Sequence, residues 1–253
     1  MFKRSWFIFL TLLCLFSAGC TQAAAPSGGE QTAAAHYTGK IVSITGGTLL
    51  LASLAEDGEA LCTAGLSDAA LTDAQGRAMT PDDLRCGMVV TIGYDGSILE
   101  TYPAQLSQPI SLAVQEDGDD LVGFYLAMLQ DLYDTDPGLN DGIKQLAFDL
   151  DGVQNLTASE KSALIYLAAQ QFQLDTFAAT YQDLLQDGLV TADRPHFTDG
   201  LLITLTAEPI SSGSFTFQAQ KWRSGTGAYF FNDCTASQKG GAWHYTIGSE
   251  AIS

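Results

Sequence analysis

The chain has 253 residues, 46% of them hydrophobic, with 11 Lys and Arg residues against 29 Asp and Glu residues. Its strong negative charge repels phosphate backbones, so we expect no nucleic-acid partner. The acids are scattered along a sequence that has enough apolar residues to form cores. Composition therefore predicts a folded protein with a solvated acidic surface, and excludes a disordered tail.

The N-terminus has the features of an export signal. Lys3 and Arg4 precede an apolar run over residues 6–16, and the small residues Ser17-Ala18-Gly19 lead to Cys20. The apolar run is shorter than the roughly 20 residues that a membrane-spanning helix needs. The small residues before Cys20 resemble the lipobox of bacterial lipoproteins, with Ser17 where Leu is more usual. That resemblance implies cleavage before Cys20 and acylation of its sulfur; an ordinary secretory signal is the alternative.

The whole sequence divides into four parts. We expect a signal peptide over residues 1–19, a flexible tether over 20–35, a small β-barrel domain over 36–109 and an α+β domain over 110–253. The tether has no large apolar residue, and as a flexible chain it would span roughly 20 Å. These features place the protein on the outer face of the cell membrane, held by a lipid anchor.

The first folded module reads as short strands joined by turns. Gly46-Gly47 predicts a hairpin, Pro81 the first residue of a short helical turn, and Asp95-Gly96 a second hairpin. This order predicts a small barrel of OB or SH3-like kind. The stretch DAQGRAMTPDDLRCGMVVTIGYDGSILETYPA, residues 73–104, resembles the barrel domains of uncharacterised secreted lipoproteins of Gram-positive bacteria. The resemblance implies a fold and assigns no active site.

The second module is expected to hold three helices and then an antiparallel β-meander. The helical spacing of apolar residues marks helices near residues 121–132, near 164–172, and after Asp175, which would serve as N-cap of a helix ending at Gly188. Four strands are expected at residues 200–206, 214–222, 227–234 and 241–248. A winged-helix domain has a similar order, but residues 176–187 hold two aspartates and no Lys or Arg, which argues against DNA binding.

Three cysteines remain in the folded part: Cys62, Cys86 and Cys234. Cys62 and Cys86 lie in the same predicted β region and are the first candidates for a disulfide, which an extracytoplasmic setting allows. The other pairings and three free thiols stay open. The chain has no CxxC motif, so redox catalysis and a compact zinc site are poorly supported.

The stretch DLDGVQNLTASE places Asp149, Asp151 and Glu160 at positions 1, 3 and 12 of a calcium loop of EF-hand type. Position 6 of such a loop is glycine, and here it is Gln154. Thr157 and Glu160 match the S/T-x-x-E capping box instead, so we expect Glu160 to start a helix. The three acids remain weak metal candidates, and we expect neither a metal nor a cofactor.

A basic and aromatic cluster marks the C-terminal strands. Its members could stack on a sugar or bind an anion: Lys221, Trp222, Arg223, Tyr229 and Trp243. In the interpretation that we favour, the aromatic residues face the core and the two basic residues flank them for solubility.

Catalytic motifs are absent from the sequence: it has no HExxH, Walker A or nucleophile-elbow pattern, and only three histidines. The preferred hypothesis is a non-catalytic lipid-anchored module that binds a protein, a peptide or a wall glycan. The alternative is an extracytoplasmic hydrolase acting on glycan or peptide through two acids, which would lie about 5–9.5 Å apart across a cleft.

Overall fold

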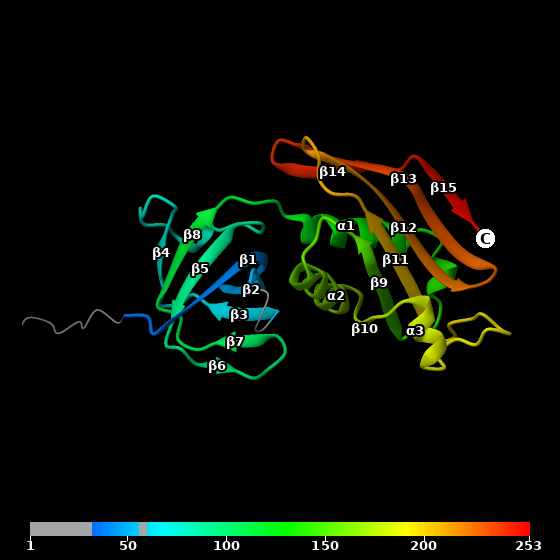
Figure 1. Ribbon diagram of the computed structural model, residues 1–253, viewed down its shortest axis with the longest axis horizontal. Coiled ribbons are helices and arrows are strands. Elements are labelled where there is room, and N and C mark those ends of the chain that lie inside the picture. The colour runs from blue at the N-terminus through cyan, green and yellow to red at the C-terminus, as the bar shows by residue number, and fades with distance from the viewer. Residues whose placement is uncertain (1–31, 56–59) are drawn as a thin grey trace, which may run out of the picture. The chain divides into compact units, whose positions relative to one another are not determined.

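The computed structural model of the protein describes residues 32–55 and 60–253 (Figure 1). The described part of the chain is mostly β, with 46% strand and 19% helix. Its strands form two large mixed sheets, and three α-helices occur in the described part of the chain. No helix among these residues is long and apolar enough to cross a membrane.

The first sheet has eight strands, in the order β4-β8-β5-β1-β2-β3-β7-β6. Its strands are β1 (Ala35–Thr45), β2 (Thr48–Ser53), β3 (Leu61–Gly65), β4 (Ala70–Thr72), β5 (Val89–Tyr94), β6 (Ile98–Leu99), β7 (Ala104–Leu106) and β8 (Ser111–Glu116). The short 3-10 helix η1 (Pro81–Asp83) precedes β5, and its first residue is the predicted proline. β8 lies beyond residue 109, where we expected the first module to end.

The hairpin predicted at Gly46-Gly47 is confirmed. β1 and β2 are antiparallel with Thr45 opposite Thr48. Gly46 and Gly47 have φ angles of 56° and 78°. Two consecutive positive φ angles are what a two-residue turn between twisted strands requires, and glycine adopts them without steric strain.

The predicted barrel is wrong, because this sheet does not close. β4 and β6 are its two end strands, and they do not pair with each other in the described structure. The expected second hairpin at Asp95-Gly96 is also wrong, since β6 pairs with β7 rather than with β5. Strand spacing along a sequence is the same for an open sheet and a barrel, so the pattern could not show whether the sheet closes.

The second sheet has seven strands, in the order β10-β9-β11-β12-β13-β14, with β15 also paired to β13. Its elements are α1 (Leu121–Asp134), η2 (Pro137–Asn140), β9 (Gln145–Val153), α2 (Ala158–Phe172), β10 (Asp175–Ala178), α3 (Tyr181–Gln186), β11 (Gly200–Ala207), β12 (Ser214–Ser224), β13 (Gly227–Lys239), β14 (Ala242–Thr246) and β15 (Ser249–Ile252). β10, β9 and β11 are parallel to one another, and the following strands are antiparallel.

The four predicted strands of the meander are confirmed as β11 to β14, but the α+β arrangement of three helices followed by strands is wrong. β9 and β10 lie between the helices in the sequence and form a parallel pair. Asp175 opens β10 rather than a helix. α3 begins later because Thr180 forms its own capping box, in which the Thr180 hydroxyl accepts from the Asp183 N–H and the Asp183 carboxylate accepts from the Thr180 N–H.

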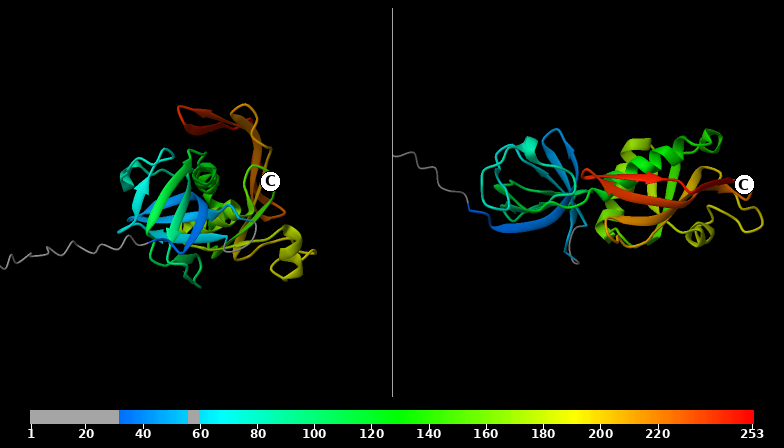
Figure 2. Two further views of the ribbon diagram at one scale, coloured as in Figure 1. Left: turned by 60° about the vertical axis from the view of Figure 1, so that its left-hand side comes forward. Right: turned by 90° about the horizontal axis from the view of Figure 1, so that it is seen from above.

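The second sheet has a helix face and an open face. On the helix face, Leu205, Phe217 and Phe231 join a core with residues of α1 and α2. Side chains alternate along a strand, so the residues between them project from the open face. α3 covers the open face at its parallel end, where Leu184 packs with Leu202. Figure 2 shows these strands from two further directions, with the C-terminus labelled at the end of β15.

Candidate functional site

The predicted signal peptide and Cys20 lie outside the described residues, as does most of the tether. The lipid anchor therefore stays a prediction. The other predicted site residues all lie within residues 32–55 and 60–253.

The three calcium candidates are not brought together as ligands. Asp149 and Asp151 lie in β9, and Glu160 lies in the first turn of α2 with 2% of its surface exposed. The predicted capping box is confirmed: Glu160 accepts from the Thr157 N–H at 2.9 Å and also from Lys40 Nζ at 2.6 Å. Within the described chain no three His, Cys, Asp or Glu residues form a metal-binding group.

The cysteines Cys62 and Cys86 belong to the core of the first sheet, but the predicted disulfide is not formed. Cys62 is wholly buried in β3, and Cys86 is a partly buried thiol between η1 and β5. Burial and, to a smaller extent, the charge of the nearby Asp120 carboxylate together raise the pKa of the Cys86 thiol to about 11. A thiol with so high a pKa has little thiolate at neutral pH and reacts slowly.

The basic and aromatic residues of the C-terminal strands divide between the two faces of the sheet. Lys221 is fully buried on the helix face, where its Nζ donates to the Tyr133 and Asp136 carbonyls and to Asn140 Oδ1 at 3.0–3.2 Å. Arg223 donates to the Leu139 carbonyl at 2.8 Å. Both cations thus bond to carbonyls at the end of α1 or in the segment that follows it, and the buried Lys221 does not flank the aromatic residues for solubility.

The aromatic members of that cluster also lie on different faces of the sheet. Trp222 alternates with Lys221 and lies on the open face, among the residues packed around α3. Tyr229 packs on the helix-face core, and its hydroxyl bonds to Glu250 at 3.2 Å. Trp243 lies on the same core, with its ring 5.1 Å from that of Phe215. The possible ligand patch is therefore not assembled: Tyr229 and Trp243 face the core, as in the interpretation that we favour.

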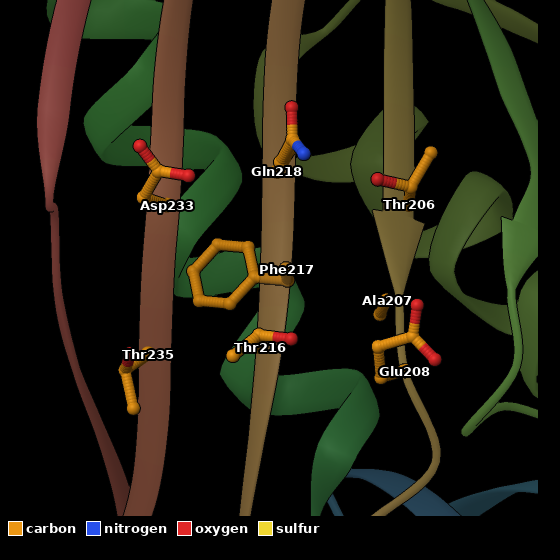
Figure 3. A pocket seen from close by; sticks show the side chains of 8 residues that line it. All are labelled: Thr206, Ala207, Glu208, Thr216, Phe217, Gln218, Asp233 and Thr235. Carbon is orange, nitrogen blue, oxygen red and sulfur yellow. The ribbon is translucent and has the colours of Figure 1, made fainter.

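A row of uncharged polar side chains follows β11 and β12 on the open face. The cross-strand register places Thr204 opposite Gln220 and Thr206 opposite Gln218. Paired Cβ atoms in such a register lie about 5 Å apart, so the side chains form one surface. We call these four residues the polar stripe. Figure 3 shows Thr206 and Gln218 beside Asp233 of β13, around a hollow of about 390 Å³.

The stripe leads to a second hollow at its aromatic end. This hollow of about 250 Å³ lies between Trp222, Tyr181, Thr204, Gln220 and Asp149. The rings of Tyr181 and Trp222 meet edge to face with their centroids 5.2 Å apart. None of the ion pairs in the described chain uses a side chain of the stripe. The stripe therefore offers hydroxyl and amide groups and one aromatic pair.

A third hollow, of about 230 Å³, lies at the carboxyl ends of β9 and β10, and we call it the acidic hollow. Asp149, Asp151 and Asp183 line it together with one basic residue, Lys161. Burial raises the pKa of Asp149, which the Asp151 and Asp183 charges raise further. Hydrogen bonds from Thr180 lower the pKa of Asp183.

The acidic hollow lies where the chain leaves two neighbouring parallel strands in opposite directions. The connection after β9 leads to α2 on the helix face, whereas the connection after β10 leads to α3 on the open face. Such a switch point at the carboxyl ends of parallel strands is a preferred ligand position in open sheets.

The sequence contains a signal for the polar stripe, although we did not predict a site from it. In the strands at residues 200–206 and 214–222, polar residues alternate with apolar ones, and period two places them on one face. Comparison of the chain with protein-family models and with curated proteins gives no match. The site is therefore argued from its own geometry.

Proposed function

We propose that this protein is a non-catalytic, lipid-anchored binding module on the outer face of the cell membrane, and that its polar stripe binds a neutral polar ligand such as a wall glycan. The observation that carries the proposal is the register of Thr204 with Gln220 and of Thr206 with Gln218, which forms a continuous uncharged surface beside the Tyr181–Trp222 pair.

The chemistry of the stripe suits a sugar. Hydroxyl and amide groups both donate and accept hydrogen bonds, as sugar hydroxyls do. Asp149 lies at the aromatic end of the stripe, and Glu208 and Asp233 lie at the other end. These carboxylates repel anionic ligands, so the site disfavours a charged acidic glycan relative to a neutral one.

Binding of a short N-acetylglucosamine oligomer to the full chain, followed by calorimetry, tests the proposal. Replacement of Gln218 and Gln220 by Ala removes two amides, and we expect at least about tenfold weaker binding. Gln115→Ala changes an exposed glutamine of β8 in the first sheet and should bind as the unchanged protein does. The proposal would be contradicted if the variant lacking Gln218 and Gln220 bound the oligomer as tightly as Gln115→Ala does. Tighter binding of a glucuronic acid oligomer by the unchanged protein would also contradict it.

The anchor is tested separately, by growing the expressing cells with a palmitate analogue. We expect label on the full chain and none on the Cys20→Ser variant. An unlabelled protein with Cys20 in place would contradict the anchor and leave the stripe proposal unaffected.

A second candidate function, hydrolysis of glycan or peptide, is favoured by the opposite pKa shifts of Asp149 and Asp183 in the acidic hollow. Such a pair can supply a protonated acid and an ionised base. Against it, the Asp183 carboxylate already accepts from the Thr180 N–H and hydroxyl. Release of reducing ends from cell-wall sacculi, lost in Asp149→Asn, would establish the hydrolase in place of the binding module.

A further inference from the structure

The outer side of β10 is an open sheet edge. β10 pairs with β9 alone in the described structure. The N–H groups of Asp175 and Ala179 point toward β9, where they donate to the Lys144 and Phe148 carbonyls at 3.1 and 3.0 Å. Because backbone groups alternate sides along a strand, Thr176 and Ala178 point their N–H and C=O groups outward. No second strand of the described structure pairs with them, because β9 is the one strand that pairs with β10.

An apolar hollow of about 440 Å³ runs beside this edge. It is lined by β10, by the outer side of α2 and by Tyr102. The Tyr102 and Tyr166 rings meet edge to face with centroids 5.9 Å apart, and Ile165 and Leu174 complete the apolar wall. The Thr176 hydroxyl donates to the Ile165 carbonyl at 2.9 Å, which fixes the strand against the helix.

The acidic hollow continues the apolar one. Ser162, Ile165 and Ala178 line both, so the two hollows follow β10 toward its carboxyl end as one groove. We call it the β10 groove. It has an apolar end beside Tyr166 and an acidic end with three carboxylates against the single ammonium of Lys161.

We propose that the β10 groove binds an extended peptide of a partner protein, which adds to β10 as a further strand. An apolar side chain of the peptide fills the hollow beside Tyr166, and a Lys or Arg side chain enters the acidic hollow. This mode of recognition takes affinity from main-chain hydrogen bonds and specificity from side-chain pockets. It goes beyond glycan binding by the polar stripe and uses a different groove, which shares Asp149 with the aromatic end of the stripe.

The charge of the protein favours this occupant over a second copy of the chain. Residues 32–253 carry 9 basic and 28 acidic side chains. Two such surfaces repel each other, whereas a basic peptide is attracted to the groove. Because the two hollows share lining residues and side chains on one face of a strand recur every second residue, we expect the apolar and basic side chains of the peptide two positions apart.

The test uses the full chain and a blocked peptide of about seven residues, with Phe and Lys two positions apart and Thr elsewhere. Binding is followed by fluorescence anisotropy. Ala178→Pro removes one outward N–H and leaves the bonds to β9 in place, because proline is tolerated on the outer side of an edge strand. We expect about tenfold weaker binding. Ala178→Gly keeps the N–H and should bind like the unchanged protein.

The acidic end is tested with Asp151→Asn, whose side chain is exposed. This variant should weaken the Lys peptide severalfold and leave a peptide with Gln in place of Lys unaffected. A Lys peptide N-methylated on its edge-facing amides should also bind about tenfold more weakly, a result that does not depend on how Ala178→Pro folds. No binding of the unmethylated peptide, or equal binding of the methylated one, would overturn the proposal.

Discussion

At the scale of single residues, the surroundings of Lys221 show how a buried charge is tolerated. Its ammonium has three oxygen acceptors within 3.2 Å, one in the last turn of α1 and two in the segment between α1 and β9. Burial lowers the pKa of Lys221 to about 8, and the charges of Asp136 and Asp134 oppose that shift. The residue therefore holds a loop in place while its charged form is disfavoured by burial.

Lys221→Met should lower the free energy of unfolding, because three buried oxygens lose their donor. The difference from the unchanged protein should also grow as the pH rises from about 8 to 10.5. In that range Lys221 is protonated in the unfolded state but deprotonated in the folded state. The free energy of unfolding of the unchanged protein therefore rises with pH, by up to about 3 kcal/mol, whereas the Met variant has no such gain. Urea unfolding at several pH values measures the difference.

The matched control is Lys239→Met, which removes an exposed lysine from the end of β13. Its difference from the unchanged protein should not grow over the same pH range. A constant or shrinking difference for Lys221→Met would contradict the prediction.

At the scale of elements, the start of α2 joins the two sheets. Glu160 caps the helix through the Thr157 N–H, and it pairs with Lys40 of β1. Lys40 is largely buried, with 18% of its side chain exposed, and that of Glu160 is 3% exposed. One carboxylate thus fixes both a helix terminus and a contact with the first sheet.

Glu160→Gln keeps an oxygen for the cap but removes the charge facing Lys40. We expect a loss of about 1–3 kcal/mol of unfolding free energy, because a partly buried ammonium then lacks its counter-ion. A double-mutant cycle with Lys40→Met should give a coupling energy of about 1 kcal/mol or more. Additive effects of the two changes would contradict the pairing.

Calcium should leave the melting temperature of the protein unchanged, because both Glu160 oxygens already accept hydrogen bonds. Thermal unfolding with and without millimolar calcium, and with chelator as the control, checks this. Stoichiometric stabilisation by calcium would show that Asp149, Asp151 and Glu160 form a site after all.

The sequence predicted those elements whose signals are local. The Gly46-Gly47 hairpin and the Thr157–Glu160 capping box each depend on residues near one another in the chain, and both are confirmed. β10 was missed because a four-residue edge strand is too short to show a clear period, and its pairing with β9 spans thirty residues. The burial of Lys221 also could not be foreseen, since its partners lie more than 80 residues away.

The site follows the same division. The polar stripe could be predicted from the alternation within β11 and β12. The β10 groove could not, because it depends on the placement of α2 and Tyr102 beside a strand that the sequence did not reveal.

At the scale of the whole molecule, the two sheets share hydrophobic core. Val42, Leu50, Ala52 and Leu61 of the first sheet belong to the same buried cluster as α1, α2 and the helix face of the second sheet. A second cluster, which includes Leu49, lies within the first sheet. Because the sheets share buried residues, we expect them to unfold together.

Leu49→Ala and Leu50→Ala should each destabilise the protein by about 2–5 kcal/mol. Both described tryptophans, Trp222 and Trp243, belong to the second sheet. If unfolding is cooperative, tryptophan fluorescence and far-ultraviolet circular dichroism will report the same lowered melting temperature for both variants. If Leu49→Ala leaves the melting temperature measured by tryptophan fluorescence unchanged, the two sheets unfold separately.

The alternation of Lys221 and Trp222 along β12 also has a consequence for folding accuracy. A slip of one residue in the pairing of β12 would exchange the two faces of the strand. The ammonium would then meet Leu184 and Leu202, and the indole would meet the Tyr133 and Asp136 carbonyls. An apolar residue at position 221 would tolerate both alignments, whereas lysine makes the slipped one unfavourable. The buried charge thereby selects against a misfolded register.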